Sequence, residues 1–343
     1  MFRFIISRLG QGIWVIWGII TLLFAIFFVL GDPVNYLTAE SADEKTREVI
    51  RQTYGLDQPL VTQYLHYLNR LLPIGTVEST QTAAHFPLFG DIAIKVPDFG
   101  TSFQTGQPVG TLISQHLEGT AFLGLTALGF AALLGILLGT FAALWKDKWP
   151  DRLILTVSVL GISAPSFFVG VLIAWLFAVK WQDITGLQVT GYLFEDHIFS
   201  PGRTVIWKNL LLPALALGIR PLAVITQLTR SSMIEVLSMD YIRTARSKGL
   251  SGRRVIGKHG LRNGMNPVIT SVTGWLASLL AGAFFIEYIF NWQGLGKLTI
   301  DALNTKDFPL IIGCVSFIGT VFVLISILTD LLYGLLDPRV RIK

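Results

Sequence analysis

The stretch of this chain closest to a reactive site is Gly252-Arg-Arg-Val-Ile-Gly-Lys-His259. Its G-x-x-x-x-G-K frame matches the loop that cradles nucleotide phosphates with backbone N–H groups and a lysine. Such a loop also needs a serine or threonine for magnesium and a buried strand before its first glycine. His259 stands at the serine position, and the preceding residues read as a polar helix. We therefore expect no ATP hydrolysis by this chain, and its energy source must lie in another protein.

Other residues able to do hydrolytic or metal chemistry are dispersed along the sequence. No G-x-S-x-G nucleophile elbow occurs, and no two histidines have the i, i+4 spacing of a helical zinc site. The histidines are His66, His85, His116, His197 and His259. Cys314, the only cysteine, lies in an apolar run, which excludes an intrachain disulfide and a cysteine metal cluster. We therefore expect no catalytic, cofactor or metal site in this chain.

Two ionisable residues within apolar segments are the remaining candidates, because charges inside a membrane are costly and mark solute pathways. Arg220 precedes Pro221 near the middle of its segment, and Glu287 lies close to the outer end of the next one. An arginine facing lipid there costs about 3 kcal/mol or more. Either Arg220 lines a path and meets a substrate carboxylate, or it snorkels or pairs inside the helix bundle, for example with Glu287.

The elements that carry these residues are membrane spans. The chain is 52% hydrophobic and 14% charged, whereas soluble domains carry about 25% charged residues. Six segments reach the roughly 20 residues that a helical span needs. They are Leu9–Leu30, Glu118–Leu144, Leu153–Val179, Leu210–Thr229, Val268–Phe290 and Phe308–Leu332. Within the second, Gly135 and Gly139 form a G-x-x-x-G that predicts close helix packing, either inside the bundle or at a dimer-facing surface.

A basic loop between the fourth and fifth spans sets the orientation. From Arg230 to Pro267 it carries eight cations against Glu235 and Asp240. Short basic loops stay on the cytoplasmic side, so both termini are predicted to be cytoplasmic and the long loop 31–117 external. The net charge of +5 does not indicate nucleic-acid binding, because the cations flank apolar spans without interleaved aromatic residues.

The basic loop also has a helical pattern. No helix breaker occurs from Met233 to Lys248, apolar residues recur at helical spacing, and Gly249 follows where a C-terminal cap belongs. The sequence therefore predicts one amphipathic helix over 233–248, held under the membrane as a surface for another protein.

These residues carry a family resemblance. Tyr241-Ile-Arg-Thr-Ala-Arg-Ser-Lys-Gly-Leu250, followed by His259-Gly-Leu-Arg-Asn263 and Pro267, resembles the coupling loop of ABC-importer permeases. More narrowly, it resembles the dipeptide/oligopeptide (peptide/nickel) transport branch. Arg243-Thr244 replaces the usual Glu-Ala, and Arg262 stands where other branches carry proline. Tyr54–Pro59, Asp98–Ser102, Asn291–Gly296 and Asp330–Arg339 extend the likeness over most of the chain.

The resemblance implies an all-α integral membrane protein with six transmembrane helices, the type I ABC importer fold and a large extracytoplasmic loop after the first helix. Residues 1–117 would form the first helix and the external cap, which includes a polar helix over Ala42–Tyr54 and an insertion over Pro73–Pro97. Residues 118–334 would form the permease core with the coupling loop 230–267, and residues 335–343 a cytoplasmic tail. In the outer loop 291–296, Trp292 suits the membrane interface, and Gly294 and Gly296 suit a tight turn.

The resemblance further implies a bacterial inner-membrane complex with a second homologous permease, two ATPases that bind ATP and magnesium, and an extracytoplasmic substrate-binding protein. The residues that would couple the chain to an ATPase are Tyr241, Arg243, Ala245, Arg246, Lys248, Gly249 and Leu250. Peptides are the expected substrates. Nickel, glutathione and sugars remain alternatives within the family, and an ion-coupled carrier or a non-transporting membrane scaffold remain alternatives outside it.

Overall fold

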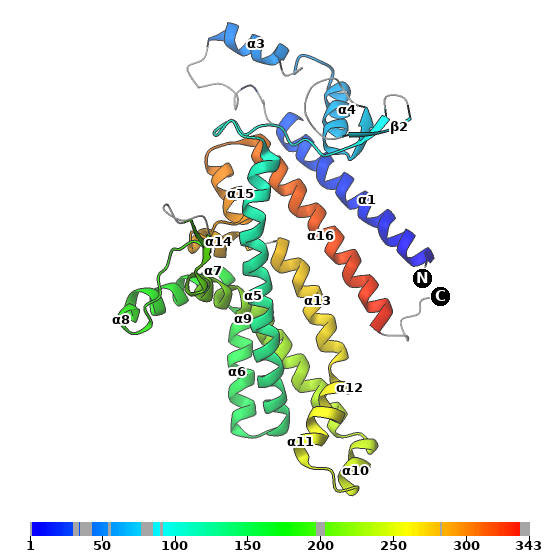
Figure 1. Cartoon of the computed structure of the whole chain (residues 1–343), viewed down its shortest axis with the longest axis vertical. Helices are drawn as coiled ribbons and strands as arrows, with labels where there is room; N and C mark the ends of the chain where they lie inside the picture. Colours follow the sequence, from blue (N-terminus) through cyan, green and yellow to red (C-terminus); the bar gives the residue numbers. More distant parts are fainter. Residues whose placement is uncertain are drawn as a thin grey trace. The chain divides into compact units, whose positions relative to one another are not determined.

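The computed structural model describes residues 2–29, 34, 43–53, 56–76, 85–89, 92–196, 203–281 and 283–336, and most of them are helical (Figure 1). The chain divides into two compact units. Unit 1 comprises Met1–Leu9, Glu118–Lys297 and Val321–Lys343, and unit 2 comprises Gly10–Leu117 and Leu298–Thr320. Most of the predicted tail, from residue 337 on, lies outside the described residues.

Unit 2 contains most of the first apolar helix and the loop that follows it. The elements that begin here are α1 (Phe2–Phe24), its π-helical continuation η1 (Ala25–Val29), α3 (Glu44–Thr53) and α4 (Leu60–Leu71). Helix α3 confirms the polar helix predicted over Ala42–Tyr54. Tyr64 of α4 packs its ring on Phe24 and exchanges a hydrogen bond of 2.7 Å with the Thr21 hydroxyl, which ties α4 to α1.

The predicted insertion Pro73–Pro97 contains a small antiparallel sheet, so the expectation of an all-α chain was wrong here. Its strands are β1 (Ile74–Thr76), β2 (His85–Phe89) and β3 (Ile92–Lys95), in the order β1-β3-β2. The Lys95 N–H also donates to the Pro73 carbonyl at 2.9 Å. Strands of three to five residues are too short for side-chain alternation to predict them, and their pairing depends on contacts between separated segments.

A buried carboxylate fastens the end of the external loop. Asp307 is fully buried before α16 (Phe308–Leu336) and accepts hydrogen bonds from the Ser102 hydroxyl at 2.5 Å and the Phe103 N–H at 3.2 Å. It also accepts from the N–H groups of Gln104 at 3.3 Å and Leu310 at 3.4 Å. Because Leu310 is in the first turn of α16, one side chain caps this helix and holds the preceding loop.

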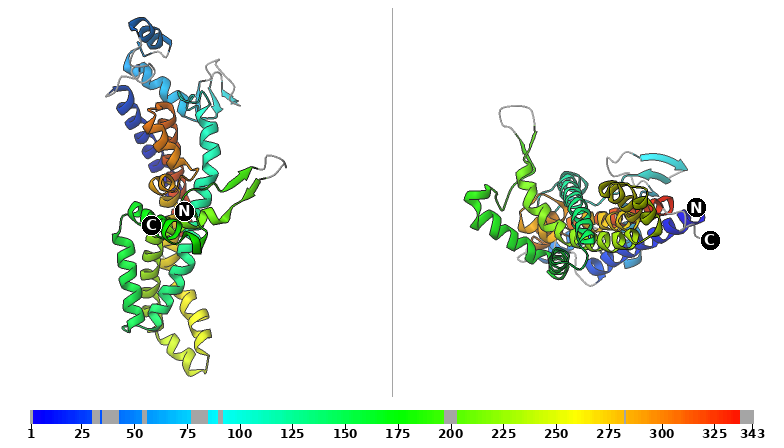
Figure 2. Two further views of the ribbon diagram at one scale, coloured as in Figure 1. Left: turned by 90° about the vertical axis from the view of Figure 1, so that its left-hand side faces the viewer. Right: turned by 90° about the horizontal axis from the view of Figure 1, so that it is seen from below.

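Unit 1 is a set of helices with one β-ribbon. Its membrane-length helices are α5 (Val109–Leu144), which begins in unit 2, α9 (Trp207–Leu237) and the end of α16. The remaining elements are α6 (Trp149–Ser163), α7 (Ser166–Ile173), η2 (Ala174–Lys180), α8 (Gln182–Thr185), β4 (Phe194–Asp196), β5 (Arg203–Val205), α10 (Asp240–Ser247), α11 (Gly252–Arg254), η3 (Val255–Leu261), α12 (Arg262–Gly264), α13 (Asn266–Ala281), α14 (Phe284–Ile289) and α15 (Leu295–Asn304), which ends in unit 2. The β4–β5 ribbon extends away from the helices of this unit in both views of Figure 2.

Four described helices are long and apolar enough to cross a membrane, or five if a bent pair counts as one span. The six predicted spans are therefore not all found as single helices. The third is broken at Ala164-Pro165, where α6 and the helix that follows meet at 111°. Proline has no N–H to continue the hydrogen-bond ladder, so it ends α6. The predicted fifth span divides into α13, of 16 residues, and the short α14.

The G-x-x-x-G of the second span packs inside the subunit. A Cβ on Gly139 would lie 2.5 Å from the Thr226 carbonyl oxygen and 2.6 Å from the Thr229 Cβ, both on α9. A Cβ on Gly135 would lie 2.7 Å from the Ile225 side chain. Only glycine allows α5 and α9 to approach this closely, which confirms the prediction of packing within the bundle.

We expect Gly139→Ala to lower the free energy of unfolding by about 1–3 kcal/mol, because its methyl group overlaps the α9 backbone. Gly129 lies on the same helix but is exposed, and a Cβ there would meet nothing within 4 Å. Gly129→Ala is therefore the matched control and should leave stability unchanged. Thermal unfolding of the detergent-solubilised complex measures both, and equal melting temperatures for the two variants would contradict the packing contact.

Candidate functional site

Helix α9 connects the parts of unit 1. It contacts α6, α7, α13 and α14, and the main core of the unit forms around its first half (Figure 1). Pro213 and Pro221 both lie inside it and both are buried. Its last residues, 230–237, are also the first part of the predicted coupling loop.

The coupling loop does not form the single helix predicted over 233–248. Helix α9 ends at Leu237, Met239 adopts an extended conformation with φ −73° and ψ 149°, and α10 begins at Asp240. The Ser238 hydroxyl donates to the Glu235 carbonyl at 2.6 Å in the last turn of α9. Neither serine nor methionine breaks a helix by itself, so the sequence carried no signal for this break.

The inner face of α10 is apolar and packs within the loop. Ile242, Ala245 and Val255 are 0%, 6% and 1% exposed, and Leu237 and Leu250 lie against them. This small core joins α10 to η3 and to the end of α9. Ala245 and Leu250, both named from the sequence as coupling residues, therefore contact their own chain here.

Gly249 ends α10 as predicted. Its φ is +74°, and its N–H donates to the Arg246 carbonyl at 2.9 Å while the Leu250 N–H donates to the Ala245 carbonyl at 3.3 Å. This left-handed residue after the helix is a position that favours glycine. A Cβ on Gly249 would meet nothing within 4 Å, so a side chain there would project from the subunit.

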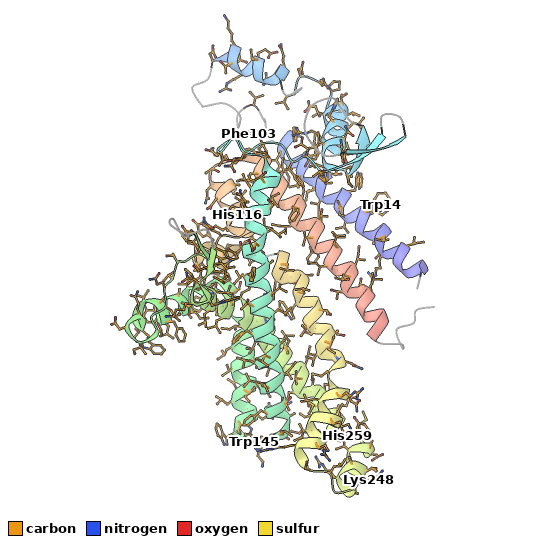
Figure 3. All side chains as sticks on the ribbon, viewed as in Figure 1. Trp14, Phe103, His116, Trp145, Lys248 and His259 are labelled. Carbon is orange, nitrogen blue, oxygen red and sulfur yellow. The ribbon has the colours of Figure 1, made fainter. Side chains whose placement is uncertain are left out.

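The outer face of α10 is polar and cationic. Four of its exposed side chains, which we call the basic face, are Tyr241, Arg243, Arg246 and Lys248, and Asp240, Thr244 and Ser247 are exposed beside them. Arg243 has only a 3.5 Å contact with Asp240, and the Tyr241 hydroxyl accepts a hydrogen bond from the Asn263 amide. Figure 3 shows Lys248 and His259 at the same end of unit 1 as Trp145, which precedes the α5–α6 turn with Lys146 and Lys148.

The stretch with the phosphate-loop frame is helical. Gly252–Arg254 forms α11 and Val255–Leu261 forms the π-helix η3. Its backbone N–H groups therefore follow a helix rather than the open loop that wraps a phosphate. No group of three metal-ligating side chains is found within the part of the chain that the structure describes.

A buried ion pair next to the loop was missed by the sequence analysis. The Arg230 guanidinium donates to both oxygens of Asp151 at 2.5 and 2.6 Å, and the Asp151 carboxylate also accepts from the Asp147 N–H at 2.8 Å. The side chains are 19% and 2% exposed. This bidentate pair joins the start of α6 to α9 about two turns before α9 ends at Leu237. The sequence analysis counted Arg230 only as part of the basic loop. Asp151 follows Pro150, a pattern typical of the first turn of a helix, and this was the one available signal.

Replacing one partner of this pair should destabilise the subunit more than the loss of the interaction alone would, because the other charge stays buried. Asp151→Asn and Arg230→Gln each leave one buried charge without its partner, and each should lower the free energy of unfolding by about 3 kcal/mol. The double variant should lose less than the sum of the two because neither charge remains. SDS titration of the purified complex measures the cycle, and strict additivity would contradict the pairing.

Glu287 is fully buried in the short helix α14. Its Oε1 accepts a hydrogen bond from the Thr120 hydroxyl at 2.7 Å, and its Oε2 accepts from the Lys297 N–H at 3.0 Å. The Thr120 oxygen in turn accepts from the Leu295 N–H at 2.8 Å. The carboxylate thus binds α5 to the start of α15 and is engaged within the subunit.

The turn 291–296 wraps this carboxylate. A Cβ on Gly294 would overlap the Glu287 carboxylate, and one on Gly296 would lie 2.6 Å from the Phe284 Cα. This confirms the tight turn predicted for the two glycines. Trp292 is 1% exposed and donates through Nε1 to the Gly119 carbonyl at 2.9 Å, so its predicted place at the membrane interface was wrong. The Gly119 carbonyl accepts the indole N–H and holds the ring inside instead.

We expect Glu287→Gln to destabilise the subunit by about 1–3 kcal/mol, because the amide NH₂ would face a hydroxyl or N–H donor. Glu287→Ala should cost at least as much. Thermal unfolding of the complex measures the loss, with Glu118→Gln, an exposed carboxylate on α5, as control. If Glu287→Gln instead kept full stability while abolishing uptake, an ion-coupling role would explain Glu287 better.

Arg220 and Glu287 are not paired. Arg220 is exposed on α9, and among the described residues the structure gives its guanidinium no hydrogen bond or ion pair. Both Glu287 oxygens are occupied by other donors. Arg220 is residue 14 of the 31 in α9, so its charge lies near the middle of this apolar helix.

The chain is similar to known transport proteins. A family model described as "Binding-protein-dependent transport system inner membrane component" matches residues 135–342, and the corresponding N-terminal model matches residues 1–124. The glutathione transport system permease protein GsiC of Salmonella typhimurium is 35% identical over 344 residues, all of both chains. GsiC of Escherichia coli is 34% identical over 346 residues, again with both chains fully covered.

A solved structure is similar at the level of the fold. An inward facing conformation of the MetNI methionine ABC transporter matches with a TM-score of 0.51 and 13% identity, over 66% of this chain and 97% of that one. The fold is therefore that of a type I ABC importer permease. The chain belongs to the family of binding-protein-dependent transport system inner membrane components, and within it to the peptide/nickel type.

Proposed function

We propose that this permease subunit forms half of the path for short peptides in an ATP-driven importer and connects it to cytoplasmic ATPases. The observation that carries the coupling role is the division of α10 into a buried apolar face and the exposed basic face. The first holds the helix rigidly on η3 and α9, and the second is free to contact a partner. A rigid, exposed helix transmits a push, whereas a mobile loop would absorb it.

In this mechanism α10 seats on an acidic surface of one ATPase. Arg243, Arg246 and Lys248 pair there with carboxylates, Tyr241 and the open Gly249 lie at the contact, and Ala245 and Leu250 support the helix from behind. ATP-driven closure of the two ATPases would move the loop and, through the Asp151–Arg230 pair, carry α6 with α9. The two permeases would then alternate between inward- and outward-open states.

The partners follow from the family. A second homologous permease completes the path, two ATPase subunits bind ATP and magnesium, and an extracytoplasmic binding protein delivers the substrate. Both chain ends lie in the cytoplasm. In support, Arg8 of α1 pairs with Asp330 of α16 at 3.1 Å within unit 1, which keeps the two ends on one side of the bilayer.

Peptides are the proposed substrates, and glutathione, itself a tripeptide, is a specific member of that class. The support is the name of the relatives, which are glutathione permeases at 34 and 35% identity over their whole length. Mass spectrometry of material co-purified with the tagged chain tests the assembly. A second permease and two ATPases are expected, whereas a chain that purifies alone and transports after ATP depletion would overturn the proposal.

Gly249→Asp should reduce ATP-dependent uptake strongly while leaving the complex assembled. The new carboxylate projects from the end of the basic face, where it would repel an acidic ATPase surface. Gly249→Asn is the matched control, because asparagine has the same size and tolerates the left-handed conformation comparably. Uptake and ATP hydrolysis in proteoliposomes measure both variants. Wild-type uptake by Gly249→Asp, or equal losses in both, would contradict charge-based docking.

A further inference from the structure

The side of α9 that faces no other helix is polar. Residues at i, i+4, i+7 and i+11 share one face of a helix. On α9 this spacing joins Arg220, Val224, Gln227 and Ser231, of which Arg220 and Ser231 are exposed and the others are partly exposed. Such a face is unusual on an apolar helix of 31 residues with two prolines inside it.

The contacts of α9 explain why this side is open. Thr226 and Thr229 lie against Gly139 of α5, and Ile219 and Ala223 lie against Gly161 of α6. The Ser232 hydroxyl donates to the Gly264 carbonyl at 2.8 Å, towards α12 and α13. Three directions around α9 are therefore occupied, and the fourth carries Arg220.

Helix α13 continues this open side with the same spacing. Pro267, Ser271, Gly274 and Ser278 follow one another at i, i+4, i+7 and i+11, and a Cβ on Gly274 would meet nothing within 4 Å. A neighbouring side of α13, about 100° round the helix from Pro267, packs through Val268 on Ile225 of α9.

Helix α5 covers one side of the α9–α13 pair. It contacts α13 where Gly124 meets Leu280 and contacts α9 at Gly135 and Gly139. Both polar stripes turn away from α5, so they border one another in a single surface. We call it the open polar face: Arg220, Val224, Gln227 and Ser231 of α9 with Ser271, Gly274 and Ser278 of α13.

We propose that the open polar face lines the substrate path of this subunit and that Arg220 makes the path selective for solutes bearing a carboxylate. The proposal rests on the proposed function and assigns it a surface and a selecting charge. Lipid is a disfavoured neighbour of this face, because a mid-membrane arginine that faces lipid is energetically costly, whereas water or an anionic group stabilises its charge. Peptides supply that group through their C-terminal carboxylate, and the path remains wet between substrates.

Cysteine labelling tests this in the assembled complex. Cys314 is fully buried and is replaced by alanine, which leaves this chain without thiols, and labelling is quantified on this chain alone. Single cysteines then replace Val224, Gln227, Ser231 or Ser278. Leu133, on the apolar exposed side of α5, provides the control position. The probes are two membrane-impermeant methanethiosulfonates, one with a sulfonate and one with a trimethylammonium group.

The four cysteines of the open polar face should react at least tenfold faster than the control at Leu133. In an Arg220→Gln background, the ratio of sulfonate to ammonium rates should fall about tenfold at Val224, one turn away, and less at Ser231, roughly 16 Å away. Rates no higher than at Leu133 would overturn the wet path. A ratio unchanged by Arg220→Gln would overturn the selecting charge and indicate a carboxylate of the second permease as its partner.

A second pair of variants tests flux. Gly274→Trp should lower ATP-dependent uptake at least tenfold by filling the path, with assembly and ATP hydrolysis retained, whereas Gly129→Trp on the exposed side of α5 should change uptake less than twofold. Equal effects would overturn the path assignment. Labelling requires no uptake. If the single-cysteine variants label as expected but the wild-type complex does not import peptides, the proposed function alone would be refuted.

Discussion

Close packing of α9 on three sides controls the arrangement of unit 1. Gly135 and Gly139 let α5 approach its backbone, Asp151 holds α6 to Arg230, and Val268 places α13 on Ile225. Each contact covers one side of α9, and among the described residues the side with Arg220 remains exposed. Because α9 also leads through the break at Met239 into α10, the helix that carries Arg220 is next in sequence to the surface that we propose contacts an ATPase.

Three buried carboxylates hold separate segments of the chain together. Glu287 and Asp307 each accept several hydrogen bonds from separate elements, and Asp151 accepts from a guanidinium and a backbone N–H. In an apolar environment an ionised group is stable only when its partners are fixed, so these sites resist rearrangement. Arg220 differs because it has no such partner among the described residues. A charge left open in this setting indicates contact with water or a solute.

The coupling loop combines rigidity with access. Its inner face forms a small core of its own, and the left-handed Gly249 ends α10 so that Leu250 returns to that core. The packed inner face therefore holds α10 in place, and the cations on its outer face have a fixed backbone beneath them. This arrangement explains why small residues occur at Ala245 and Gly249 for two different reasons: Ala245 fits between packed elements, and Gly249 satisfies a backbone conformation.

The sequence by itself determined the membrane class, the family, the end of α10 at Gly249, the close contact at Gly135 and Gly139, and the glycine turn at 294–296. All of these depend on composition, motif or local conformation, which residues close together in the sequence determine. The tertiary structure alone decided the break at Met239, the division of the fifth span, the sheet within 73–97, the buried place of Trp292 and the Asp151–Arg230 pair. The sheet, the buried place of Trp292 and the ion pair depend on partners outside their own segment, and no helix-breaking residue type marks the break at Met239. Arg220 stands open because other helices cover the remaining sides of α9 and not its own.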